Sequence, residues 1–274
     1  MGKIIEIFKQ HKWELLWIYM FMLITELFIL ATPFLLGKSI DGLIDGTYHW
    51  LVLLGISYFL STFFHYKRMV YDTKVYTKIY NNIVFKFLKN KETDMSTKVA
   101  RTDMANEIVH VLEGYVHYYI ATIVTIIGSI GIIYTENWKV GVLVTVAMGL
   151  IVGAGMVYYK KIQQSILVRN NHNEKKANSL ELGYDHSVSF FNRLRKLNIY
   201  DSTIQGKNWF LVGLIKNVFL FISIILLVVT AKNITIGGVI TVYSYVNNFL
   251  ISLLSVPVAI EMYTRLTDVL KRIG

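Results

Sequence analysis

A carboxylate stands inside the first long apolar stretch of this sequence. Glu26 lies in the run from Trp13 to Leu36, and helical spacing places Tyr19 and Pro33 on roughly the same face. Because a charge buried in a bilayer is costly, an acid in such a stretch marks a candidate functional position. Two interpretations stay open. Glu26 either lines a cavity, where it meets a cationic substrate or a proton, or pairs with a polar group of another span.

A second polar set lies in the last apolar stretch, residues 239–260. Tyr243, Asn247 and Asn248 interrupt it and are candidates for the face of a cavity. A structural hydrogen bond between two membrane helices explains the same residues equally well. We therefore take Glu26 and Tyr19, together with these three residues, as candidates for a substrate path.

Two further patterns imitate chemical sites. His110, Glu113 and His117 form a His-x-x-Glu-x-x-x-His face on a predicted helix, for which a solvated surface is favoured over a metal site. The Gly-Lys-Ser at 37–39 is not part of a phosphate-binding loop, because Thr32 occupies the position where that motif requires its first glycine. No nucleophile–base pair stands out either, so we expect no catalytic residues, no metal and no enzyme activity in this chain.

Composition defines the setting of these residues. The chain of 274 residues is 54% hydrophobic and 17% charged, whereas about a quarter of the residues of a soluble domain are charged. Several apolar runs are long enough to cross a bilayer, which predicts an all-α membrane protein. Cysteine is absent, which excludes disulfides and thiol chemistry. The net charge of +10 is attributed to cytoplasmic Lys and Arg, and we expect no nucleic-acid partner.

Six membrane spans are predicted. Residues 1–12 form an amphipathic interfacial helix, and residues 66–116 and 160–208 form two long helical hairpins outside the membrane, with breaks at 90–96 and 197–202. A helix from residue 50 to 90, at about 1.5 Å per residue, is roughly 60 Å long and projects far beyond the bilayer. The spans are approximately 13–36, 50–65, 117–134, 140–159, 209–231 and 239–260.

The charges orient this topology. Nearly all Lys and Arg residues lie on the side of the hairpins, whereas the three short turns carry only Lys38, Lys139 and Lys232. By the positive-inside tendency, both termini and both hairpins are cytoplasmic, in a bacterial inner (plasma) membrane. In the fourth span, Gly149 and Gly153 form a small-x-x-x-small pair, which either permits close helix packing or is incidental.

This layout resembles the transmembrane domain of exporter-type ABC transporters. The resemblance covers nearly the whole chain and includes two local features. Residues 37–42 match the Gly–basic–x–Ile–Asp sequence at the outer end of the first span, and the last span opens at Gly237 and carries Tyr243 and Pro257. The resemblance implies a domain-swapped dimer with twelve spans around a central cavity, in which the fourth and fifth helices reach across to the partner chain.

The family also has short coupling helices at the ends of its cytoplasmic hairpins, which contact a nucleotide-binding domain. The resemblance places the first at about residues 94–103 and the second at 195–203. The coupling candidates it implies are Asp94, Arg101, Asp103, Arg195, Tyr200 and Asp201.

The expected function follows from the resemblance and from one absence. The sequence contains no Gly-x-x-x-x-Gly-Lys-[Ser/Thr], so ATP and Mg²⁺ are expected on a separately encoded nucleotide-binding subunit. The chain is then the membrane subunit of an exporter of a hydrophobic or amphipathic substrate, as a homodimer or heterodimer. We expect a naturally short subunit, although a chain cut at its domain boundary has the same sequence. The alternative is a motor-free secondary transporter, channel or regulatory scaffold.

Overall fold

The computed structural model of the chain describes residues 10–89, 102, 105–106, 109, 111–173, 175–231 and 234–255. All regular structure in these residues is helical. In chain order the elements are α2 (Lys12–Ile44), α3 (His49–Lys89), the π-helix η1 (Val111–Val116), α5 (His117–Glu136), α6 (Trp138–Asn173), α7 (Lys176–Glu181), α8 (Tyr184–Thr230) and α9 (Ile236–Leu254).

Five of the described helices are long and apolar enough to cross a membrane: α2, α5, α6, α8 and α9. The expected second span belongs to α3, which does not reach the same hydropathy. Its apolar stretch, residues 50–65, is short and gives way to Lys67 and Arg68. Five spans are therefore supported by composition, and the sixth stays a prediction.

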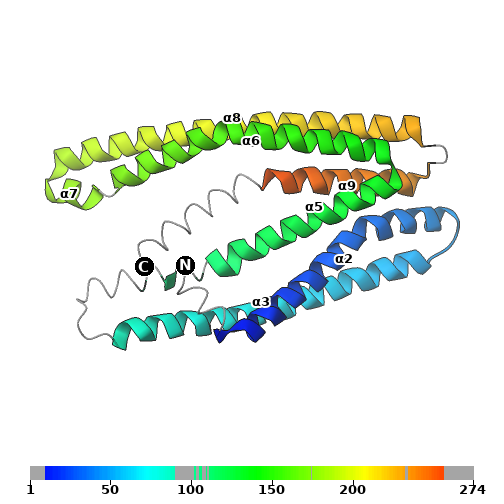
Figure 1. Cartoon of the computed structure of the whole chain (residues 1–274), viewed down its shortest axis with the longest axis horizontal. Coiled ribbons are helices and arrows are strands. Elements are labelled where there is room, and N and C mark those ends of the chain that lie inside the picture. The colour runs from blue at the N-terminus through cyan, green and yellow to red at the C-terminus, as the bar shows by residue number, and fades with distance from the viewer. Residues whose placement is uncertain are drawn as a thin grey trace.

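The helices lie along one another in an elongated bundle (Figure 1). The connections at residues 45–48 and 137 lie at one end, as do the end of α8 and the start of α9, and we call this the turn end. The opposite end carries α7 between the long helices α6 and α8, and we call it the hairpin end. The 33 residues of α2, at about 1.5 Å each, span about 50 Å. Since a hydrocarbon core is about 30 Å thick, such helices extend well outside it.

Apolar side chains pack the bundle in two regions. One core lies between α5, α6, α8 and α9, with Tyr245 and Phe249 of α9 fully buried in it. The other lies near the hairpin end, where Leu15 and Ile18 of α2 pack against Tyr76 and neighbouring residues of α3. Glu14 of α2 pairs with Lys78 of α3, and Ser57 of α3 donates to the Phe28 carbonyl, so α2 and α3 run antiparallel.

The first long helical extension is confirmed, because α3 continues without interruption from His49 to Lys89. The predicted break at 197–202 is wrong, because α8 is one continuous helix of 47 residues. Residues 197–202 contain no Gly or Pro that would interrupt a helix, and Asp201 is buried against α6. The chain instead turns back within residues 175–183, where Gly183 adopts a φ of +100°, a conformation that favours glycine. The predicted interfacial helix at 1–12 lies largely outside the described residues.

The expected glycine packing in the fourth span is not found within this chain. A Cβ atom at Gly149 or Gly153 would meet no heavy atom within 4 Å among the described residues. The close helix approach occurs instead at Gly37 and Gly237, where α2 meets α9.

Candidate functional site

At the turn end, a carboxylate of α2 holds the beginning of α9. Asp41 Oδ1 accepts a hydrogen bond from the Gly237 N–H at 2.8 Å, and Asp41 Oδ2 accepts one from the Thr235 hydroxyl at 2.7 Å. Thr235 caps α9 by accepting from the Gly238 N–H at 3.0 Å. We call Asp41, Thr235 and Gly237 the turn-end clamp. It joins two sequence features on which the family resemblance depends, residues 37–42 and the opening of the last span at Gly237.

The clamp requires glycine on both helices. A Cβ at Gly237 would lie 2.6 Å from Asp41 Oδ2 and even closer to the Gly37 carbonyl oxygen. A Cβ at Gly37 would collide with the Thr241 hydroxyl and the Gly237 carbonyl. The two backbones therefore approach more closely than any larger residue permits, which is a physical reason for glycine at both positions.

Below the clamp, α9 continues to hydrogen-bond to the backbone of α2. Thr241 Oγ1 donates to the Pro33 carbonyl at 3.3 Å, and Tyr245 Oη donates to the Leu30 carbonyl at 2.8 Å. This antiparallel register places Glu26 level with the turn of α9 that carries Asn248. The first and last membrane helices thus form one seam, with Thr241 and Tyr245 of α9 facing α2.

The structure does not join the predicted substrate-path residues into one site. Glu26 and Tyr19 are half-buried on α2, whereas Tyr243 is exposed on α9 and Asn247 and Asn248 are half-buried. No hydrogen bond or ion pair connects Glu26 to the α9 residues within the described part of the chain. Tyr243 and Asn247 are one turn apart on the face of α9 that points away from the seam.

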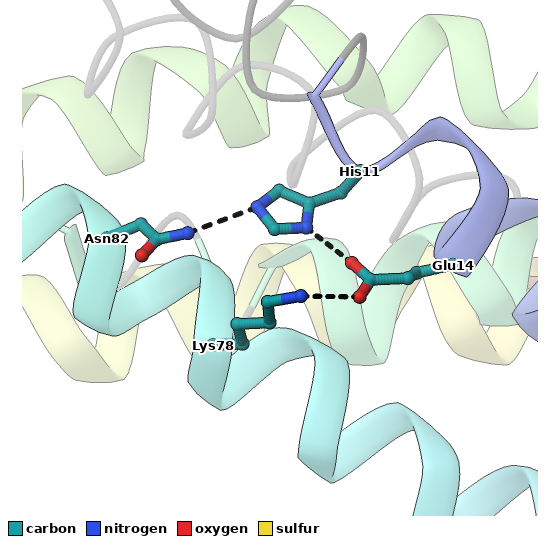
Figure 2. A network of polar contacts seen from close by, with 4 residues as sticks. All are labelled: His11, Glu14, Lys78 and Asn82. Atoms are coloured by element: carbon teal, nitrogen blue, oxygen red, sulfur yellow. Dashed lines mark hydrogen bonds and ion pairs between the residues drawn. The ribbon is translucent and has the colours of Figure 1, made fainter.

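At the hairpin end, a polar network fastens the start of α2 to α3 (Figure 2). Glu14 accepts from Lys78 Nζ at 2.6 Å and is also bonded to the His11 ring, whose Nε2 lies 3.2 Å from Asn82 Nδ2. We call these four residues the hairpin-end clasp. It holds the beginning of α2 against Lys78 and Asn82, which lie on α3 beyond its apolar stretch at residues 50–65. The first turns of α2 therefore lie beside the charged extension of α3.

Between the clasp and the apolar stretch of α3 lies a buried ionic group that the sequence analysis missed. Asp72 is only 6% exposed, and its Oδ2 lies 3.4 Å from His117 Nε2 of α5 and 3.6 Å from Arg68 Nε. The rings of Tyr19 and Tyr76 lie 5.8 Å and 6.1 Å from that of His117. We call these five residues the Asp72 cluster.

Burial raises the pKa of Asp72 to about 7, which Arg68 opposes and Glu113 reinforces. Asp72 lies on α3 beyond its expected span. A sequence signal existed: Arg68, Asp72 and Tyr76 recur at four-residue spacing on the face of α3 that buries Ile79. Arg68 and Asp72 thus lie on the same face of α3 as its buried apolar residues.

The expectation of a solvated face at His117 is wrong, because this side chain is only 6% exposed. It packs between α2 and α3, whose tyrosines cover it. His110 lies outside the described residues. Among those described, no group of three or more His, Cys, Asp or Glu side chains is placed to hold a metal ion.

The residues predicted for motor coupling belong to two different parts of the chain. Asp94, Arg101 and Asp103 lie outside the described residues. Arg195 and Tyr200 are exposed on the continuous helix α8, where residues 191–203 line an open hollow.

Asp201, in contrast, is buried and accepts from Arg169 Nη1 of α6 at 2.6 Å. This ion pair holds α6 and α8 together. The short helix at the tip of the second hairpin is α7, about 20 residues before the expected position of the coupling element.

Comparison with known proteins adds one finding. The sequence pattern of the family described as ABC transporter transmembrane region matches residues 4–237. That match contains the Gly37–Gly42 stretch and ends at Gly237 of the turn-end clamp. A search of curated proteins finds no match.

Proposed function

Because the chain belongs to the family of ABC transporter transmembrane regions, we propose that it is the membrane-spanning subunit of an exporter. In this proposal it moves a hydrophobic or amphipathic substrate by alternating access, and a separately encoded nucleotide-binding subunit supplies the energy of ATP. The observation that carries the proposal is the length of the helices. α3, α6 and α8 are longer than a bilayer is thick, and a short helix joins two of them at the hairpin end.

The tip of the second hairpin is the proposed site of motor docking. Leu180 and Leu182 are 53% and 58% exposed there, and they flank Glu181 at the end of α7. Exposed leucines at the turn of a hairpin suit a groove on a partner protein. We therefore transfer the second coupling element from 195–203 to α7, and keep the first at 94–103.

Two copies of the chain, or this chain and a related one, enclose the substrate path in this proposal. The polar face of α9, with Tyr243 and Asn247, and the half-buried Glu26 contribute to it. The exposed stretch of α8 at 191–203 faces the partner chain. Six spans per chain, with α3 as the second, would leave both termini on one side of the membrane, and the excess of Lys and Arg on that side supports the cytoplasmic side of a bacterial inner membrane. A substrate drives the change of state only through its different affinities for the inward- and outward-facing forms.

The docking proposal is tested by site-specific cross-linking. The chain has no cysteine, so Leu180→Cys introduces a single reactive thiol at α7. Trp138→Cys, 64% exposed at the turn end, is the matched control. In membranes of the source cell, Leu180→Cys is expected to cross-link to an ATP-binding protein and Trp138→Cys is not. Equal labelling of both variants, or cross-links from neither to such a protein, refutes docking at α7.

A second function is favoured by Glu26 alone. This acid is half-buried in an apolar helix and close enough to Arg68 for their charges to interact. A motor-free transporter driven by protons would use such a group. Glu26→Gln would then abolish proton-driven uptake into vesicles that contain only this chain. Under the exporter proposal such vesicles show no proton-driven uptake in either variant.

A further inference from the structure

The Asp72 cluster is assembled from three separate parts of the chain. α3 supplies Asp72, Arg68 and Tyr76, α2 supplies Tyr19, and α5 supplies His117 at its first residue. Asp72 Oδ2 is the atom that both His117 Nε2 and Arg68 Nε approach, at 3.4 Å and 3.6 Å. The cluster therefore responds as a unit to any change of charge on this one carboxylate.

Its charges are unbalanced. Arg68 interacts with Asp72 and also with Glu26 of α2, while Glu113 of η1 repels Asp72. Asp72 and Glu26 thus share the one guanidinium of Arg68, Glu113 adds a further negative charge acting on Asp72, and a neutral imidazole at His117 leaves negative charge in excess. Uptake of a proton reduces this excess, whichever of the two facing groups carries it.

The hydrogen bonding of Asp72 agrees with proton uptake. Its Oδ1 is buried and has no hydrogen-bond partner among the described residues. An ionised carboxylate is stabilised by several donors, and a buried one without them is better accommodated as the neutral acid. The raised pKa of Asp72 is consistent with this geometry.

The junction at which the cluster lies is unusual in its backbone. η1, Val111–Val116, is a π-helix that ends immediately before His117. π-turns are rare, and they occur frequently at functional sites, where they redirect a side chain. Here the π-helix carries Glu113 and sets the direction from which His117 approaches α3. A change in the charge of Asp72 therefore acts on the element that connects the hairpin extension to α5.

We propose that Asp72 and His117 form a proton-binding site that joins α3 to α5. The proton comes from water at the hairpin end and resides on the Asp72 carboxyl, which faces His117 Nε2. With the proton bound, the pair attracts and the junction is closed. When the proton leaves, the ionised Asp72 and Glu113 repel each other and the junction loosens. The site goes beyond the transport function and does not depend on it.

Infrared spectroscopy of the full chain in lipid nanodiscs tests this directly. A protonated carboxyl has a C=O stretching band that an ionised one lacks. In the wild type, one such band is expected to disappear as the pH is raised from about 5 to about 9. Asp72→Asn is expected to remove it. Asp185→Asn, an exposed acid in the first turn of α8, is expected to keep it. No titrating band in the wild type, or the same band in Asp72→Asn, overturns the proposal.

The contribution of His117 has its own measurement. His117→Gln removes the second proton acceptor and keeps a polar side chain of similar size. The midpoint at which the Asp72 band disappears is expected to move by at least about half a pH unit. An unchanged midpoint removes His117 from the site and overturns the proposal of a joint site.

A distance measurement keeps the proposal testable if Asp72→Asn does not fold. Tyr66→Cys and Ile123→Cys, exposed on α3 and α5, carry spin labels in an otherwise unaltered, cysteine-free chain. The distance between the labels is expected to change between about pH 6 and pH 9. A control pair on α6 and α8, at Leu150 and Phe221, is expected to be insensitive to pH. A distance on α3 and α5 that does not respond, or an equal response in the control pair, overturns the proposal.

Discussion

Replacing Asp41 by Ala is expected to weaken the attachment of α9 to α2. The change removes two hydrogen bonds to a carboxylate, from the Gly237 N–H at 2.8 Å and the Thr235 hydroxyl at 2.7 Å. Hydrogen bonds to charged groups contribute about 1.5–3 kcal/mol each, and an acid at a helix N-terminus adds about 0.3–1 kcal/mol. Asp41 is partly exposed, so solvent weakens both bonds, and we expect a loss of about 2–3 kcal/mol, at or slightly below the sum of their two lower limits.

The assay is thermal unfolding in detergent. For a chain of this size, about 1 kcal/mol corresponds to a shift in Tm of roughly 2–4 °C, so Asp41→Ala is expected to lower Tm by about 4–12 °C. Asp41→Asn keeps an acceptor for the Gly237 N–H and is expected to lower it less. Asp45→Ala changes an exposed acid four residues further along and serves as the control. If the Tm of Asp41→Ala equals that of Asp45→Ala, the clamp does not hold the two helices together.

Three further substitutions probe separate parts of the structure, each by thermal unfolding in detergent. Gly37→Ala introduces a Cβ between α2 and α9 beside the clamp and is expected to lower the free energy of unfolding by about 1–3 kcal/mol. Gly149→Ala places its Cβ in open space and is expected to leave the Tm unchanged or raised. Equal losses in the two variants would contradict the close approach of α2 and α9. Asp201→Asn weakens the 2.6 Å pair with Arg169 and is expected to cost about 2 kcal/mol, and an unaltered Tm would show that the pair does not hold α6 to α8. Burial raises the pKa of Asp72 to about 7 in the folded protein. The folded state therefore binds more protons than the unfolded state between about pH 4 and pH 7, and stability falls as the pH rises through this window. Asp72→Asn is expected to remove that slope, and a slope equal to the wild type's would refute the assignment.

The architecture was largely accessible from the sequence because apolar run length and helical periodicity report directly on membrane helices. The continuous helix from about residue 50 to 90 was predicted and found, as was the short turn near residue 137. The break in the second hairpin was placed wrongly because Asn198, Asp201 and Ser202 are common in turns. Asp201 has its partner, Arg169, on α6, 32 residues earlier in the chain, and only the fold reveals that this pair holds a continuous helix in place.

The candidate sites were harder to predict because they depend on contacts between distant elements. Asp41 and Gly237 are almost 200 residues apart in the sequence, and each was noticed only as part of a family resemblance. Asp72 was overlooked because a charged residue on a helix extension outside the membrane suggests a solvated surface. Its burial results from Tyr19 and His117, which come from two other helices.

The central claim, that this chain works with a separate motor, is tested most directly by purifying it from its own membranes and measuring ATP hydrolysis. The account predicts a nucleotide-binding subunit in fixed proportion to the chain, with hydrolysis that vanadate inhibits. Removal of that subunit is expected to abolish the activity. Purification of the intact chain from native membranes without such a subunit, and without vanadate-sensitive hydrolysis, would contradict the claim and leave the motor-free alternative.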